Sequence, residues 1–225
     1  MYQYIVEELG QQIVHGRYRA GEVLPTEDRL CEELRVSRGV LREATKVLTQ
    51  KGLIEVKPKV GTQVLAREHW NLFDPDVLLW HLQVEDAHRF LKTVTEVRSI
   101  IESEAARLAA IRAKADEMDS MKKLLNRMAQ ILADTDQYDY KAFLDVDIAF
   151  HASILNASHN DLLSQIGSTM REALIQAREH DARDIDHQRA SLPFHERIVD
   201  AISRGDAEAA YLASKQMFDD VWKLL

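Results

Sequence analysis

The first 66 residues contain three helical segments followed by two strand segments, an order that few folds use. Apolar residues at helical spacing predict a helix over residues 1–15, which Gly16 ends. Thr26 is a good N-cap for a second helix and Ser37 for a third, with a short polar break between the two helices. Two β-rich segments, 53–57 and 62–66, are separated by PKVG, which suits a hairpin. This order predicts a winged helix-turn-helix domain with three helices and a small β-hairpin wing.

Polar residues at the start of the predicted third helix suggest what this domain binds. Arg38 and Arg42 are four residues apart, so both project from one helical face. In a helix-turn-helix this segment enters the DNA major groove, where arginines bind guanine O6 and N7. Gly39 permits a close approach to DNA, and Ser37 with the free backbone N–H groups can hold a phosphate. The alternative is that the two arginines only form a solvated helix face.

The distribution of charge along the chain helps to decide whether these arginines bind DNA or only form a solvated helix face. A net charge of −8 argues against nucleic-acid binding by the chain as a whole. Residues 1–66, however, contain 10 basic and 9 acidic residues, whereas the remainder contains 19 basic and 28 acidic ones. Only the N-terminal third can therefore approach a phosphate backbone. The residues expected to add non-specific phosphate contacts are Arg17, Arg19, Lys46, Lys57 and Lys59.

Residues 15–64 resemble the DNA-binding domain of the GntR family. The markers are a glycine-containing loop that ends in LPTE, then VSRGVLREA, KGLIE and a wing that closes on GTQV. The resemblance implies that bases and phosphates are contacted from the third helix and the wing tip, by Ser37, Arg38, Arg42, Pro58 and Lys59. Asp28 departs from the pattern, because relatives often carry a basic or neutral residue there that touches the DNA backbone. We assign Asp28 no role in DNA binding.

Beyond residue 72 nearly every segment favours a helix. Asp74-Pro75 is a typical helix entry, and the next proline is Pro193. Amphipathic stretches cover residues 72–82, 86–113, 116–133, 138–156, 160–181, 188–203 and 206–224. They lack coiled-coil heptads and internal repeats, so they predict an all-α bundle of six to seven helices.

The predicted fold class is therefore mainly α, with two functional parts. Residues 1–67 form the winged helix-turn-helix domain. Residues 68–85 form a linker and the first helix of the second domain, and residues 86–225 form the rest of that helical domain.

Polar residues interrupt the apolar faces of two predicted helices. Asp147 and His151 lie four residues apart in FLDVDIAFHASIL, so they project from one face amid apolar neighbours. They can share a divalent metal or a bound acid, or they can simply hydrogen-bond each other. Arg98 falls on an inner stripe, which is unusual for an unpaired cation. It either pairs with Glu102 or Asp147, or it clamps an anion.

Residues 86–220 resemble the FCD ligand-binding domain that accompanies FadR-type members of the GntR family. The markers are EVRSIIESEAARLAA, the D-x-x-F-H sequence that ends at His151, and FHERIVDAISRGDAEAA. The resemblance implies that Arg98 helps to hold the carboxylate of an effector, and that three residues bind a metal: Asp147, His151 and His195.

The family's fourth metal ligand falls on Met217, whose soft thioether is a poor match for zinc beside oxygen and nitrogen ligands. Two arrangements therefore stay open. One is a three-ligand site for a divalent metal of the zinc or nickel class. The other is a metal-free pocket in which Arg98, Asp147, His151 and His195 contact the effector directly.

Together these patterns predict a homodimeric, ligand-responsive repressor that binds a pseudo-palindromic operator and is released by a small carboxylate effector. Residues 71–83 resemble the same junction in members of the family that respond to sugar acids such as galactonate, so sugar acids lead the list of effectors. The single Cys31, and the lack of a signal peptide or an apolar run long enough to span a bilayer, predict a cytoplasmic protein without a membrane partner.

Two alternatives belong to other functional classes. A metal-dependent enzyme could use Asp147, His151 and His195, but the sequence offers no additional acid–base pair and the winged helix would remain unexplained. A winged-helix module that binds only proteins would show no salt-dependent affinity for DNA.

Overall fold

The computed structural model describes residues 1–83, 87–134, 138–178 and 185–224. They divide into two compact units, residues 1–87 and 88–225. Each unit has its own hydrophobic core. The predicted mainly α fold class is confirmed, with a single small sheet among the described residues. None of the described helices combines the length and apolar character needed to cross a bilayer.

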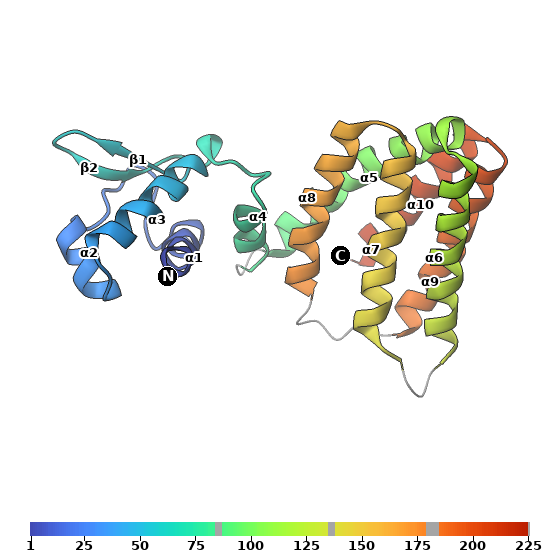
Figure 1. Cartoon of the computed structure of the whole chain (residues 1–225), viewed down its shortest axis with the longest axis horizontal. Helices are drawn as coiled ribbons and strands as arrows, with labels where there is room; N and C mark the ends of the chain where they lie inside the picture. Colours follow the sequence, from blue (N-terminus) through green and yellow to red (C-terminus); the bar gives the residue numbers. More distant parts are fainter. Residues whose placement is uncertain (84–86, 135–137, 179–184, 225) are drawn as a thin grey trace. The chain divides into compact units, whose positions relative to one another are not determined.

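The N-terminal unit is a winged helix-turn-helix (Figure 1). It contains α1 (Tyr2–Val14), α2 (Glu27–Leu34), α3 (Arg38–Gln50), β1 (Ile54–Lys57) and β2 (Gly61–Val64). Both predicted N-caps are confirmed: the Thr26 hydroxyl accepts a hydrogen bond from the backbone N–H of Arg29, and the Ser37 hydroxyl accepts one from that of Val40. The strands pair antiparallel, with Ile54 opposite Val64.

The three helices and the hairpin close over one apolar core. Each helix contributes residues at helical spacing, as the sequence pattern predicts. The most deeply buried members are Ile5, Leu9, Ile13, Leu41, Ala44, Leu48, Leu53, Ile54 and Val64. Because α3 buries only this one face, its polar face remains at the surface of the unit.

Helix α4 (Pro75–Leu82) follows a short 3-10 turn, η1 (Arg67–His69), and packs on the N-terminal unit. The Lys51 ammonium lies 2.7 Å from Asp74 and 2.8 Å from Asp76 at the start of α4. The Trp80 ring packs so closely on α1 that a Cβ at Gly10 would collide with it. We expected this helix to belong to the second domain, but these contacts group it with the first. Residues 84 and 85 of the predicted linker lie outside the described residues.

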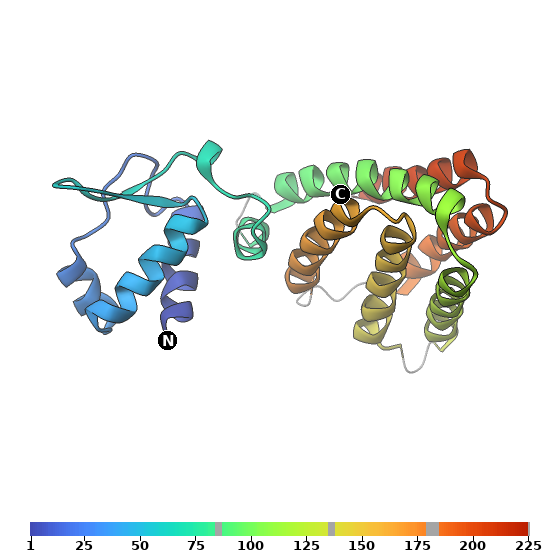
Figure 2. The same ribbon diagram turned by 45° about the horizontal axis from the view of Figure 1, so that its top comes forward.

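The second unit is a helical bundle, as predicted. In its described residues six helices appear: α5 (Ala87–Arg112), α6 (Ala115–Ala133), α7 (Tyr140–Ala157), α8 (Asp161–Arg178), α9 (Ile185–Ser203) and α10 (Ala207–Leu224). Figures 1 and 2 show α6, α7 and α8 side by side, with α5 running across them. Residues 179–181, predicted to continue α8, lie outside the described part of the chain.

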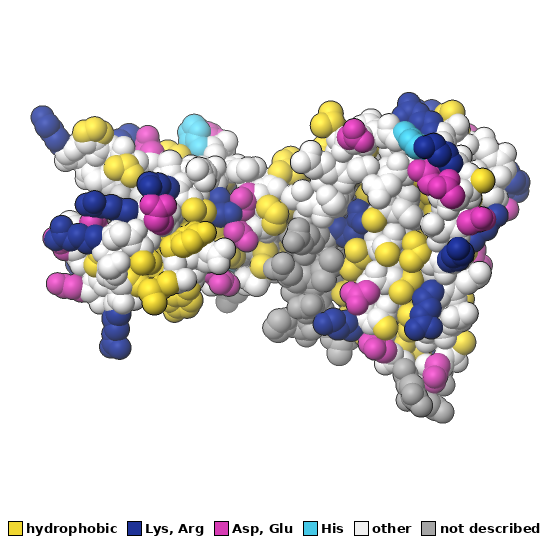
Figure 3. Space-filling view, in the orientation of Figure 1, with side chains coloured by type: hydrophobic (Ala, Val, Ile, Leu, Met, Phe, Trp, Pro, Cys, Tyr) yellow, Lys and Arg dark blue, Asp and Glu magenta, His cyan; other side chains and the backbone are white. Residues whose placement is uncertain are grey.

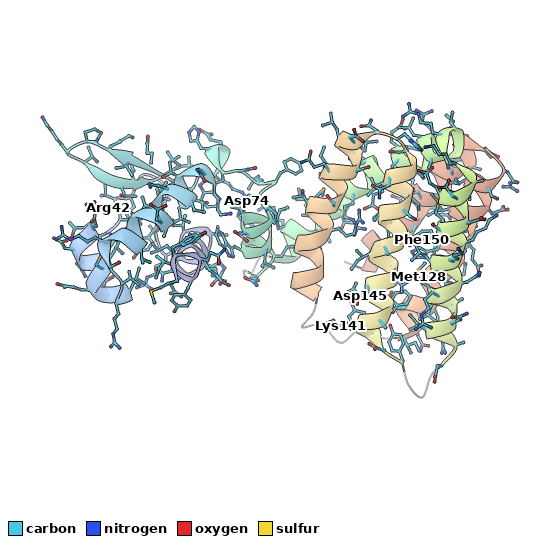
Figure 4. The ribbon with its side chains drawn as sticks, viewed as in Figure 1. Arg42, Asp74, Met128, Lys141, Asp145 and Phe150 are labelled. Carbon is cyan, nitrogen blue, oxygen red and sulfur yellow. The ribbon has the colours of Figure 1, made fainter. Side chains whose placement is uncertain are left out.

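The core of this bundle surrounds α7. Phe150 of α7 and Met128 of α6 are both fully buried and lie where these two helices face each other (Figure 4). The core also takes residues from α5, α9 and α10, among them Ala106, Ala109, Ile198, Ile202, Met217 and Phe218. Polar side chains within so apolar a core must be paired, because an unpaired buried charge is costly. The polar residues of α7 therefore identify a candidate site.

Candidate functional site

The first two turns of α3 carry the candidate DNA-contacting arginines at the surface. The side chains of Arg38 and Arg42 are 64% and 65% exposed. The Arg38 Nη2 lies 2.7 Å from Asp28 Oδ1. Arg42, labelled in Figure 4, contacts Glu27 twice, through Nε at 3.2 Å and Nη2 at 3.1 Å. Both guanidinium groups thus pair with carboxylates of α2 while much of their surface stays accessible.

The backbone at the start of α3 is open towards solvent. Ser37 uses its side-chain hydroxyl to cap the helix. A Cβ at Gly39 would meet only that hydroxyl oxygen, at 3.9 Å. Packing within the protein therefore does not require glycine at position 39. The absence of a side chain is consistent with close approach of another molecule.

The wing tip is a tight turn between β1 and β2. The backbone N–H of Val60 donates to the Lys57 carbonyl at 3.2 Å, and Pro58 and Lys59 occupy the two central positions, both exposed. Lys59 has a φ of 61°, a conformation that favours glycine or asparagine. In the space-filling view several Lys and Arg side chains project around α2, α3 and the hairpin (Figure 3). This end of the unit is the surface suited to a phosphate backbone.

A buried polar cluster lies inside the second unit. It brings together Asp147 and His151 of α7 with His195 of α9, and their candidate ligand atoms all lie within 4.8 Å of one another. The Asp147 Oδ1 is 3.1 Å from His195 Nε2 and 3.7 Å from His151 Nε2. The two histidines are 5% and 2% exposed. Residues about fifty positions apart in the sequence thus form one site.

Each of the two imidazoles is held through its Nδ1. The Nδ1 of His151 lies 2.8 Å from Glu102 Oε2, and that of His195 lies 3.0 Å from the Ser191 carbonyl. Both rings therefore present Nε2 towards Asp147. The Nε2 of His195 is buried and makes no well-aligned hydrogen bond with the described residues. A histidine oriented through its second nitrogen in this way is arranged as metal-binding histidines usually are.

Glu102 and Arg98 of α5 extend the cluster. Arg98 Nε donates to Glu102 Oε1 at 2.7 Å, and its guanidinium lies 5.1 Å from the centre of the Phe218 ring. Burial alone would raise the pKa of Glu102, but the charges of Arg98 and His151 hold it well below its ordinary value. Burial likewise opposes ionisation of Asp147, while the charges of the two histidines and Arg98 hold its pKa well below its ordinary value. Both carboxylates are therefore ionised.

Arg171 of α8 is a buried charged residue that the sequence analysis did not identify. It is 5% exposed, and its Nη1 donates to the Ile148 carbonyl at 2.9 Å, next to Asp147 on α7. Burial lowers the pKa of the guanidinium, and the charge of Arg98 adds to that effect while Glu102 and Asp147 oppose it. No pattern marks Arg171 in the sequence, because α8 has the alternation of polar and apolar residues of an ordinary surface helix.

Met217 is the residue to which the family resemblance assigns the fourth metal ligand. It lies on α10 and is 4% exposed as part of the apolar core. The next residue, Phe218, has its ring centre 6.2 Å from that of His151. The described donor set is thus one carboxylate and two imidazoles.

A winged helix with exposed arginines, joined to a helical domain with a buried polar site, defines a DNA-binding regulator with a separate sensing domain. The comparisons give the family. Residues 1–64 match the family of bacterial regulatory proteins known as gntR, and residues 93–220 match the FCD domain. The chain belongs to the GntR family and carries an FCD domain.

Several relatives match over nearly the whole chain. The galactonate operon transcriptional repressor of Escherichia coli K12 is 36% identical, over 95% of this chain and 91% of the relative. The regulator LutR of Bacillus subtilis is 30% identical, over 93% and 95%. The Uxu operon transcriptional regulator of E. coli K12 is 30% identical, over 98% and 84%.

Solved structures support the same fold. A Streptococcus agalactiae GntR protein superposes with a TM-score of 0.56 and 23% identity, over all of both chains. A structure described with Lar of Listeria monocytogenes gives a TM-score of 0.64 at 17% identity, over 99% of this chain and 95% of the other. At these identities the likeness concerns the fold alone.

The chain is therefore a ligand-responsive, DNA-binding transcription regulator. The family and its relatives do not favour the alternative function of a metal-dependent enzyme.

Proposed function

We propose that this protein is a cytoplasmic, homodimeric repressor that is released from a pseudo-palindromic operator by a small carboxylate effector. The observation that carries the sensing half is the buried site, in which His151 and His195 are both held through Nδ1 and both present Nε2 towards Asp147. Two imidazole nitrogens thus face one carboxylate, at 3.1 and 3.7 Å, an arrangement that suits a shared cation or the hydroxyl groups of a ligand.

The DNA-binding half rests on α3 and the wing. Arg38 and Arg42 stand on one exposed face, where they can reach guanine edges in the major groove. Ser37 and Gly39 allow close contact with a phosphate at the helix start, and Pro58 and Lys59 reach the DNA backbone from the wing. Two copies of α3 in a dimer would read two half-sites.

A sugar acid is the proposed effector class. The E. coli relative at 36% identity is named for the galactonate operon and another relative for the Uxu operon, and both match nearly the whole chain. The groups of the buried site, Arg98, Asp147, His151 and His195, combine a cation with acceptors and donors for hydroxyl groups.

A divalent metal of the zinc or nickel class fits this site. Asp147 supplies an oxygen and the two histidines supply nitrogens, which such metals accept, and Glu102 and Ser191 orient the rings. When bound, the metal would act as a Lewis acid that anchors an oxygen of the effector. Met217 would leave the site with three protein ligands, so further positions stay open for water or effector oxygens.

The proposed regulation is thermodynamic linkage. An effector that binds the second unit more tightly in the DNA-free arrangement shifts the population towards that arrangement, typically with a coupling of about 1–3 kcal/mol. The residues of the buried site bind and orient the effector. They do not need to move far, because only the difference in affinity between the two arrangements matters.

The sensing half is tested by a thermal-shift screen of sugar and organic acids, with and without EDTA. Wild type and His195→Ala are compared, with His69→Ala as a control because His69 is exposed on η1. A shift that disappears with EDTA indicates metal-mediated sensing, and one that survives indicates direct recognition. If no acid in a broad panel shifts the melting temperature, the sensing half is wrong.

The DNA half is tested separately by selecting duplexes from a randomised library and measuring their affinity at fixed salt. Arg38→Ala should lose roughly 1–3 kcal/mol of specific binding. Unchanged affinity of this variant for the selected duplex would refute the assignment of base recognition to Arg38.

A further inference from the structure

Arg171 is a buried cation without a counter-ion of its own. Only 5% of the residue is exposed, and its one hydrogen bond within the described residues goes to the backbone carbonyl of Ile148. Its Nε is buried and has no hydrogen-bond partner there. Within the same residues no carboxylate lies close enough to form an ion pair with it. A buried guanidinium with an unpartnered N–H is costly, so an acceptor that the chain itself does not supply can complete its hydrogen bonds.

Arg98 is in the opposite situation. Its Nε lies 2.7 Å from Glu102 Oε1, and both side chains are at least nine-tenths buried. The same Glu102 also contacts His151. The charge of Arg98 is therefore already neutralised inside the protein, although Arg98 is the residue that resemblance to the family connects with the effector's carboxylate.

The position of Arg171 ties it to the buried site. Ile148, which accepts its hydrogen bond, follows Asp147 directly on α7. The guanidinium consequently lies against the backbone of α7 beside the Asp147, His151 and His195 cluster. Its charge interacts with those of Glu102 and Asp147. The site thus contains a guanidinium with an unpartnered N–H next to groups that bind hydroxyl oxygens or a metal.

We infer that Arg171 binds the anionic group of the effector, while Arg98 serves to neutralise Glu102. A guanidinium with free donors can clamp a carboxylate through two parallel hydrogen bonds. The effector class that fits is a small hydroxy acid whose carboxylate pairs with Arg171 and whose hydroxyl groups reach Asp147 and the histidines. This inference rests on the proposed sensing function and specifies where the carboxylate binds.

The first test needs no ligand. Melting temperatures of the full-length protein are compared for Arg171→Met and Arg98→Met, which replace each cation by an apolar chain of similar length. Arg171→Met should melt at the same or a higher temperature than wild type, because no direct ion pair is lost and a buried unpartnered donor is removed. Arg98→Met should melt at a lower temperature, because Glu102 is left uncompensated. An equal loss in both variants would show that Arg171 has a structural role and would overturn the inference.

The second test uses matched pairs of acids and neutral polyols: galactonate with galactitol, gluconate with sorbitol, and lactate with propane-1,2-diol. Isothermal titration should show wild type binding at least one acid and none of the polyols. Arg171→Met should bind that acid at least tenfold more weakly, and Arg171→Lys should fall between the two. Unchanged affinity in Arg171→Met, or equal binding of acid and polyol, would overturn the inference.

The two tests also separate this inference from the proposed function. If no acid binds wild type, the effector class is wrong, and the melting temperatures still decide the role of Arg171. If an acid binds and releases DNA but Arg171→Met binds it normally, the proposed function stands and the inference about Arg171 fails.

Discussion

The Asp28 carboxylate lies 2.7 Å from the guanidinium of Arg38, and both side chains are about two-thirds exposed. An exposed pair of this kind adds little to stability. Its position at the start of α3 matters more, because a negative charge beside the arginine that we propose to read DNA would repel phosphates and compete for the arginine's donors. We therefore predict that Asp28 lowers affinity for random-sequence DNA and so favours discrimination between DNA sequences.

Replacing Asp28 by Asn should raise affinity for random-sequence DNA by several-fold, since one unfavourable charge near the phosphates disappears. Affinity for a selected duplex should rise less, so the ratio of specific to non-specific binding should fall. Fluorescence anisotropy at several salt concentrations measures both. Glu33→Gln is the matched control, because Glu33 also pairs on α2, with Arg29 at 2.9 Å, away from Arg38. Equal changes in DNA affinity for Asp28→Asn and Glu33→Gln would mean that the net charge of the unit, and not the position of Asp28, determines the effect.

Lys59 offers a prediction in which stability and DNA binding change in opposite directions. Its φ of 61° costs an ordinary L-residue about 1 kcal/mol, which glycine avoids. Lys59→Gly should therefore leave the N-terminal unit as stable as wild type or more so by up to about 1 kcal/mol, while DNA affinity falls and its salt slope decreases by about one. Denaturant unfolding measures the change in stability, and fluorescence anisotropy at several salt concentrations measures the change in DNA affinity. Lys46→Gly would be a poor control, because glycine weakens the α3 helix. Lys59→Asn is the preferred control, since asparagine tolerates the same φ and lacks the charge of lysine.

Local rules predicted some parts of the structure well. Thr26 and Ser37 cap their helices as expected, because capping depends on residues within one turn. The shared face of Asp147 and His151 follows from their spacing alone. That His195 joins them could be expected only from resemblance to a family, because helix packing decides it.

Other features escaped sequence analysis for a physical reason. Arg171 has an unremarkable place in the helical pattern, and its burial depends on how α8 packs against α7. Helix α4 groups with the first unit because Lys51 binds Asp74 and Trp80 fits against Gly10, contacts between residues far apart in the sequence. Periodicity predicts that a helix exists, but it does not say which unit will bury it.

Glu102 links Arg98 to His151, so its removal should be costly. Glu102→Gln leaves Arg98 buried without a counter-ion and is expected to lower the free energy of unfolding by about 3–5 kcal/mol. The double variant Arg98→Met/Glu102→Gln should lose less than the sum of the two single variants, because neither charge is then left alone. Denaturant unfolding of wild type, the two single variants and the double variant gives the coupling energy of a double-mutant cycle. Strict additivity would contradict a coupled buried pair.

Restoring the family's fourth ligand tests the metal proposal. Met217→His places an imidazole where the resemblance implies the missing ligand, and it should strengthen zinc or nickel binding by at least tenfold over wild type. Metal titration with a competing chelator measures the change. His195→Ala in the same background should abolish the gain, since it removes one of the remaining ligands. A gain that persists without His195 would place the metal elsewhere.

His81 predicts how stability depends on pH. It is 6% exposed on α4 with its ring 5.6 Å from that of Trp70, and burial, aided by the charges of Arg67 and His15, lowers its pKa from 6.5 to about 4. Between these two pH values the unfolded chain therefore binds more protons than the folded one. The contribution of His81 to the free energy of unfolding is fully present above pH 6.5 and is lost as the pH drops towards 4. A shift of this size corresponds to about 3 kcal/mol.

The measurement is denaturant unfolding of wild type and His81→Gln between pH 7.5 and 5. The variant loses stability at neutral pH through altered packing, but it should lose less on acidification, because glutamine does not titrate. His69→Gln is the control: His69 is more than half exposed on η1, so this change should leave the wild-type profile intact. Parallel profiles for wild type and His81→Gln would mean that groups other than His81 cause the acid sensitivity.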